Sequence, residues 1–150
     1  MADTQITVYT ITPDMPEFQE VWNLREEVLR KPLGLSLKND NLSRDYIDTI
    51  FVASSGGSVI GCVFMHRLSE EQIQLRAMAV YPQWQGKGIG RMLVQAAEKY
   101  AWQAGYKQII LHARKVAMGF YASMGYTTYG DEFTEVGIPH YMMSLQSPQV

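Results

Sequence analysis

The stretch MAVYPQWQGKGIGRMLVQAAEKYA, Met78–Ala101, carries the strongest pattern in the chain. An apolar run and Pro82 lead into QGKGIG, and a run with apolar residues at helical spacing follows. A glycine-rich turn that opens a helix directs several backbone N–H groups and the positive end of the helix dipole at one point. A Cβ atom at Gly86, Gly88 or Gly90 would hold a ligand away from those groups. The pattern predicts a cradle for phosphate or pyrophosphate, and a purely structural turn is the alternative.

Two familiar phosphate-binding motifs do not fit this spacing. A dinucleotide-binding Gly-x-Gly-x-x-Gly would need glycine at position 91, which is Arg91. A P-loop would need Ser or Thr after Gly86-Lys87, where Gly88 stands. The stretch therefore predicts a phosphate site of another kind.

Around this stretch, the chain alternates between strand and helix patterns. Strands are expected over residues 5–11, 49–54, 58–68, 72–80, 106–113, 126–130 and 140–146, and helices over residues 14–30, 89–101 and 115–124. Asp14 and Glu17 predict a capping box for the first helix, and residues 31–45 read as a loop with at most a short helix. The order β-α-β-β-β-α-β-α-β-β predicts one mixed α/β domain over residues 1–150, with a large twisted sheet flanked by helices.

Composition narrows the classes of partner and compartment. The 150 residues include 47% hydrophobic residues and carry a formal net charge of −2, so no basic field favours nucleic acid or an anionic membrane. No apolar run approaches the ~18 residues of a membrane span. The only cysteine, Cys62, lies in the apolar run VIGCVFM, which predicts a core position and favours a reducing, cytoplasmic setting. The three histidines are too widely spaced to predict a metal site.

Two motifs in register resemble those of the GNAT superfamily of acyl-CoA-dependent N-acyltransferases. The first is Gln/Arg-x-x-Gly-x-Gly/Ala after a strand that ends in Val-x-Pro, here QGKGIG over Gln85–Gly90. The second is Ala-x-x-Phe-Tyr-x-x-x-Gly-Phe/Tyr, here AMGFYASMGY over residues 117–126. The resemblance covers about residues 5–145 and implies a mainly antiparallel sheet with one splayed strand pair. Arg114 departs from the pattern, because many relatives carry Asn at that position.

The resemblance also implies where acetyl-CoA, the cosubstrate, would bind. Its pyrophosphate would contact the loop N–H groups, and its pantetheine arm would pair with the splayed end of the preceding strand. The implied residues are Met78, Ala79, Val80, Gln85, Gly86, Lys87, Gly88, Ile89, Gly90, Arg91 and Arg114. Strands 72–80 and 106–113 should then be parallel neighbours that diverge past Val80. Lys87 would add local positive potential, unless it is an ordinary exposed loop lysine.

Acyl transfer to a primary amine sets three chemical requirements. A lysine-like amine is neutral in only roughly 1 of 2,500 molecules at pH 7, so a base or water relay must remove a proton. A backbone N–H near Ala79 or Val80 could stabilise the developing oxyanion. Tyr121, at the family's usual donor position, would protonate the leaving thiolate, although a half-buried core aromatic is the alternative.

Several residues stay open as the base or as part of the acceptor site. Glu135, His140 and His112 are the candidates for the base, beside a water relay. Arg76 either faces outward or lines the acceptor groove. The acceptor would be a small-molecule or peptide amine, bound by residues 31–45 and the C-terminal segment. A non-catalytic acyl-CoA-binding regulatory module is the alternative function, and the chain is compatible with a monomer or a homodimer.

Overall fold

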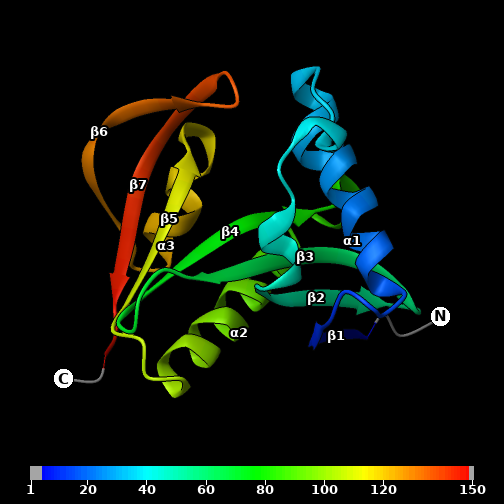
Figure 1. The fold of residues 1–150 in the computed structure, drawn as a ribbon, viewed down its shortest axis with the longest axis horizontal. Coiled ribbons are helices and arrows are strands. Elements are labelled where there is room, and N and C mark those ends of the chain that lie inside the picture. The colour runs from blue at the N-terminus through cyan, green and yellow to red at the C-terminus, as the bar shows by residue number, and fades with distance from the viewer. Residues whose placement is uncertain (1–4, 149–150) are drawn as a thin grey trace.

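The computed structural model describes residues 5–148, which form one seven-stranded sheet with helices on both faces (Figure 1). The strands are β1 (Ile6–Ile11), β2 (Thr49–Ser55), β3 (Ser58–Arg67), β4 (Gln72–Val80), β5 (Gln108–Arg114), β6 (Thr127–Glu135) and β7 (Ile138–Gln146), and the α-helices are α1 (Glu17–Arg25), α2 (Ile89–Gln103) and α3 (Met118–Ser123). The spatial order is β1-β2-β3-β4-β5-β7-β6. No helix within residues 5–148 is long and apolar enough to cross a membrane. The predicted fold class and element order are confirmed.

Among the strands of residues 5–148, β4 and β5 form the one parallel pair, and the other pairs are antiparallel. The two strands pair only over Gln72–Leu75 and Gln108–Leu111, and then spread apart (Figure 1). They are parallel neighbours as predicted, but the gap opens before Val80. The cause is a β-bulge, because Ala77 has a φ of 52° and the β3–β4 register shifts beside it. The bulge turns β4 away from β5.

Two apolar layers hold this splayed sheet. Leu93 and Ala97 of α2, completely buried, belong to the core cluster on one face of the sheet. Leu24 of α1, also fully buried, packs in the cluster on the other face with Ile50 and Phe64. The helical spacing of the α2 residues places them on one face of the helix, so that each buries its apolar surface against the sheet. Packing from both faces fixes the strands that border the gap.

The start of the first helix differs from the prediction. α1 begins at Glu17, and Pro16 at its N-cap makes no side-chain capping bond, so the expected capping box is wrong. Asp14 instead accepts a hydrogen bond from Thr12, and Glu17 accepts one from the Tyr9 hydroxyl at 2.9 Å. Asp14 thus bonds a local partner and Glu17 a tertiary one, and these bonds replace the expected bonds to the N–H groups at the start of the helix.

The end of that helical segment also differs. After Arg25 the chain widens into a π-helical turn, η1 (Glu26–Arg30), so residues 14–30 do not form one regular helix. Three 3₁₀ turns follow, over 31–33, 37–39 and 43–46, where at most a short helix was expected. Arg30 of η1 and residues from Leu37 to Arg44 form one wall of a cavity described below.

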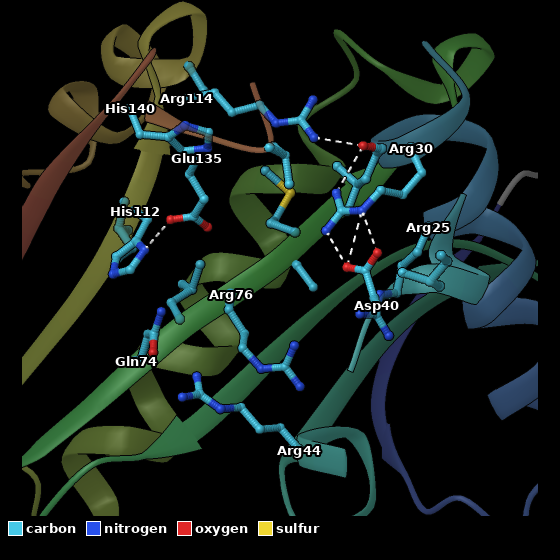
Figure 2. A pocket seen from close by; sticks show the side chains of 18 of the residues that line it. Arg25, Arg30, Asp40, Arg44, Gln74, Arg76, His112, Arg114, Glu135 and His140 are labelled. Carbon is cyan, nitrogen blue, oxygen red and sulfur yellow. Dashed lines mark hydrogen bonds and ion pairs between the residues drawn. The ribbon is translucent and has the colours of Figure 1, made fainter. Parts of the chain in front are cut away.

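The last two strands are longer than predicted and form a hairpin. β6 runs through Glu135, and Val136 and Gly137 turn the chain with φ values of 47° and 78°. Residues 131–135 alternate weakly and are mostly exposed, so only their pairing with β7 reveals them as strand. The hairpin carries Glu135 and His140 toward the gap between β4 and β5 (Figure 2).

Candidate functional site

A cavity of about 490 Å³, here called the loop cavity, lies where the end of β4 meets the start of α2. Its walls are Val28, Met78, Ala79, Val80, Trp84, Gln85, Gly86, Gly88, Ile89, Gly90, Arg91 and Phe120. All the residues expected to bind the cofactor line this cavity except Lys87 and Arg114. The Gln85 side chain donates to the Val80 carbonyl at 2.9 Å and ties the glycine-rich loop to β4.

Backbone N–H groups converge on the loop cavity. The first bond of α2 runs from the Met92 N–H to the Gly88 carbonyl at 3.0 Å, so the N–H groups of residues 88–91 have no acceptor within the helix. Gly86 and Gly88 have φ values of 77° and 81°, which a side chain would strain. A Cβ on Gly90 would lie 3.4 Å from Phe120 and 3.5 Å from Met78. The residues present therefore fit a pyrophosphate, as expected for acyl-CoA.

The two exceptions lie elsewhere. Lys87 is exposed, with its Nζ 5.4 Å from the centre of the Trp84 ring, and it does not line the loop cavity. Arg114 extends from the end of β5 and donates to the Leu29 carbonyl at 2.9 Å. It lines a second cavity, so the structure offers it a role on that side of the gap.

This second cavity, here called the polar cavity, measures about 400 Å³. It is lined by Arg25, Leu29, Arg30, Leu37, Asp40, Asn41, Leu42, Arg44, Gln74, Leu75, Arg76, Ala77, Met78, Leu111, His112, Arg114, Ala117, Tyr121, Glu135, Val136 and His140 (Figure 2). Met78 lines both cavities, which therefore meet at the gap between β4 and β5.

Helix α3 places two consecutive aromatics on different cavities. Phe120 lines the loop cavity and Tyr121 lines the polar cavity. Tyr121 is 6% exposed, and its hydroxyl has no hydrogen-bond partner within the described residues 5–148. Burial raises the pKa of Tyr121, so the phenol is protonated at neutral pH and available as a donor.

All three residues considered for the base line the polar cavity. His112 Nδ1 and Glu135 Oε2 are 2.7 Å apart, and this hydrogen bond, with the nearby positive groups, lowers the pKa of Glu135 despite partial burial. His140 Nδ1 is 2.9 Å from the Ile138 carbonyl, which can only accept, so Nδ1 carries a proton. The ring of Phe133 lies 5.4 Å from His112 and 5.8 Å from His140.

A largely buried charge network reaches the polar cavity through Arg25 and Arg76. Arg76 donates to Asp45 at 2.8 Å and to Asp48 at 2.6 Å, and Arg25 donates to Asp45 at 2.6 Å. His66 completes the chain, with Nδ1 2.6 Å from Asp48. Arg76 thus lines the groove, which was one of its two expected positions. Sequence reasoning missed the carboxylates because they lie in a segment with no periodicity.

Sequence reasoning also missed Arg30, Asp40 and Arg44, which line the same cavity. Arg30 lies in the π-helical turn, Arg44 in the last 3₁₀ turn, and Asp40 directly after the 37–39 turn, in a segment where charged residues normally face solvent. No local pattern separates them from ordinary exposed residues. Within residues 5–148, no three His, Cys, Asp or Glu side chains come together in a way that could hold a metal ion.

The geometry agrees with the comparison to known families. The sequence profile of the acetyltransferase (GNAT) domain matches residues 27–147. The chain belongs to the GNAT acetyltransferase family. An uncharacterized N-acetyltransferase of Chlorobaculum tepidum is 32% identical over 89 residues, covering 59% of this chain and 56% of its own. N-acetyltransferase 8 of Mus musculus is 26% identical over 153 residues, covering 88% of this chain and 67% of its own. The chain spans about half the length of the first curated GNAT relatives it matches.

Solved GNAT structures share the fold over nearly the whole chain. An acyl-CoA N-acyltransferase from Pseudomonas aeruginosa superposes with a TM-score of 0.79 at 19% identity, covering 95% of this chain and 99% of its own. A GNAT family acetyltransferase from Elizabethkingia anophelis, solved with acetyl-CoA bound, has a TM-score of 0.71 at 18% identity, covering 95% and 98%. At these identities the likeness establishes the fold.

Proposed function

We propose that this GNAT protein is an N-acetyltransferase that moves an acetyl group directly from acetyl-CoA to the primary amine of an acceptor. The observation that carries the proposal is the meeting of two cavities at Met78, one with a backbone N–H cradle and one lined by titratable side chains. A thioester and an amine that enter from opposite sides would meet in the gap between β4 and β5. Family membership supports this reading.

The loop cavity would hold acetyl-CoA. The N–H groups of residues 88–91 would bind the pyrophosphate, and the edge of β4 over Met78–Val80, which β5 leaves unpaired, would bind the pantetheine arm. Most of these contacts would be made by backbone groups, which explains how a chain of net charge −2 could hold a polyanion. Arg91 at the rim adds a positive charge.

The polar cavity would hold the amine and move its proton. His112, with Nδ1 held by Glu135, would accept a proton at Nε2 as the nitrogen attacks the thioester carbonyl. A backbone N–H near Ala79 or Val80 would stabilise the oxyanion. The C–N bond forms and the C–S bond breaks, and Tyr121 would give its proton to the departing thiolate. The products are an N-acetyl amide and coenzyme A, and solvent restores the two side chains.

Purified protein with acetyl-CoA and a panel of amines tests the proposal. We expect amine-dependent release of free thiol, and a product heavier by one acetyl group in the mass spectrum. A non-catalytic acyl-CoA-binding module would bind coenzyme A in calorimetry without amine-dependent thiol release. A purely structural domain would show neither. The buried, unpaired Cys62 is consistent with the cytoplasmic location that we propose for this reaction.

A further inference from the structure

Two guanidinium groups share one acceptor at the upper wall of the polar cavity (Figure 2). Arg30 Nη1 donates to the Leu29 carbonyl at 3.0 Å, and Arg114 Nη2 donates to the same oxygen at 2.9 Å. The first arginine comes from the π-helical turn after α1 and the second from the end of β5. Two like charges are thereby held close together at a partly buried site, which is unfavourable unless negative charge offsets them.

The chain offsets only one of these two charges by direct contact. Asp40 accepts from Arg30 Nη2 at 2.8 Å and from Arg30 Nε at 3.3 Å. Arg114 has no carboxylate within ion-pair distance among the described residues. Desolvation and the charge of Arg30 lower the pKa of Arg114, yet a guanidinium stays charged at neutral pH. Glu135, the next carboxylate of this wall, is hydrogen-bonded to His112, and its charge partly opposes the lowering of the Arg114 pKa without an ion pair.

The other arginines of the polar cavity are either ion-paired or exposed. Arg25 and Arg76 are paired with the buried Asp45 and Asp48. Arg44 is exposed and lies at the opposite side of the cavity in Figure 2, and its side chain has no ion-pair or hydrogen-bond partner among the described residues. Arg114 is therefore the partly buried cation whose charge the described residues leave without a direct ion pair.

We infer that the acceptor is a small amine that also carries a free carboxylate, and that Arg114 and Arg30 bind this carboxylate while the amine reaches the gap at Met78. This inference rests on the proposed acetyl transfer. The planar guanidinium suits a carboxylate, as the contact of Asp40 with Arg30 already shows. Arg30, Arg114 and Asp40 leave one positive charge, which among the described residues only Glu135, hydrogen-bonded to His112, opposes without direct contact. One bound carboxylate, with a single negative charge, would contact it directly. A phosphate monoester, with nearly twice that charge, would meet repulsion from Asp40. A cavity of about 400 Å³ suits an amino acid.

The inference is tested with the L-amino acids, each as the free acid and as its carboxamide. The carboxamide keeps the amine and the side chain but loses the negative charge. We expect at least one free acid to be acetylated with a kcat/KM roughly 10- to 100-fold above its amide, the range of a lost charge-assisted hydrogen bond. β-Alanine against O-phosphoethanolamine, two short primary amines that differ in the anion, separates carboxylate from phosphate, and we expect the carboxylate to be preferred.

Arg114→Gln should remove that preference, so that the ratio of kcat/KM for the free acid to kcat/KM for its carboxamide falls toward one. Arg114→Lys keeps the positive charge but lacks the paired N–H donors of the planar guanidinium. It should restore part of the preference for the free acid. The matched control is Arg67→Gln, an exposed arginine at the end of β3 that lines neither cavity, and it should behave as wild type. Melting temperatures of all three variants establish that they fold. The acid should also raise the melting temperature more than its amide with coenzyme A present, a binding measurement that needs no turnover.

The outcomes separate the inference from the proposed function. Transfer to carboxylate-free amines that equals or exceeds transfer to every free acid would overturn the inference and leave the acetyltransferase intact. Preference for the phosphate compound would also overturn it. Equal loss for acid and amide in Arg114→Gln would mean that Arg114 only shapes the cavity. Binding of the acid over its amide without any acetyl transfer would support the carboxylate site and contradict the proposed function.

Discussion

His112 and Glu135 lie 2.7 Å apart although β7 separates their strands in the sheet. Glu135 is the last residue of β6, and the ring of Phe133 in the same strand packs edge-on against His112. The hairpin end thus brings a carboxylate to Nδ1 of an imidazole on β5 and leaves Nε2 without a partner within residues 5–148. A carboxylate in that position selects the tautomer whose Nε2 can accept a proton.

Because of Glu135, the stability of the folded protein should decrease as the pH falls in the acid range. Its pKa lies below the ordinary 4.5, first because of the hydrogen bond with His112. A lowered folded-state pKa contributes stability that is present above 4.5 and is lost as the pH falls through the folded-state value. Glu135→Gln lacks this contribution. The difference in melting temperature between wild type and Glu135→Gln should therefore shrink as the pH is lowered below 4.5. A difference that stays constant with pH would mean that the hydrogen bond between His112 and Glu135 does not stabilise the protein in solution.

His112→Gln should lower kcat/KM at neutral pH by roughly 10²–10⁴-fold, because glutamine keeps polarity but has no basic nitrogen. Affinity for coenzyme A, measured by calorimetry, should stay within a small factor. Glu135→Gln should cost less, since it acts through His112. His140→Gln is the comparison, because Nε2 of that buried ring also carries no proton when neutral. A larger loss in a folded His140→Gln protein would assign the base to His140.

Tyr121→Phe should lower kcat by roughly 10²–10⁴-fold with little change in melting temperature, because the ring packing is kept and only the proton donor is lost. The matched control is Tyr126→Phe. Tyr126 packs on Tyr121 at 5.7 Å but donates to Glu98 at 2.9 Å and lines neither cavity. It should lose stability, by about 1–3 kcal/mol, and keep kcat. A Tyr121→Phe enzyme within threefold of wild type, with chemistry rate-limiting, would assign the acid to another group or to solvent.

Gly90→Val should weaken binding of coenzyme A by tenfold or more, measured by calorimetry, because its branches would enter the loop cavity between Phe120 and Met78. Gly90 suits this test better than Gly88, where the φ of 81° would strain any side chain. Gly119→Val is the control, at the same position of helix α3, in open space outside both cavities. Unchanged affinity in a folded Gly90→Val protein would contradict the cofactor site.

The sequence by itself determined the order of the elements and the cradle, because both depend on local patterns. Helical spacing over Ile89–Gln103 identifies α2, and the alternate glycines before it identify the N–H cradle without knowledge of any distant residue. The second motif likewise located Tyr121 near the site. In each case residues a few positions apart determine the geometry.

Only the tertiary structure decided where the strands part and what faces the acceptor. The gap opens after Leu75 because Ala77 adopts a positive φ, for which alanine gives no signal. Arg30 and Arg114, which are distant in the chain, donate to the same Leu29 carbonyl. The position of that carbonyl depends on a π-helical turn that no periodicity marks. Contacts of this kind depend on strand register and on the path of the loops, so they emerge only when the sheet is assembled.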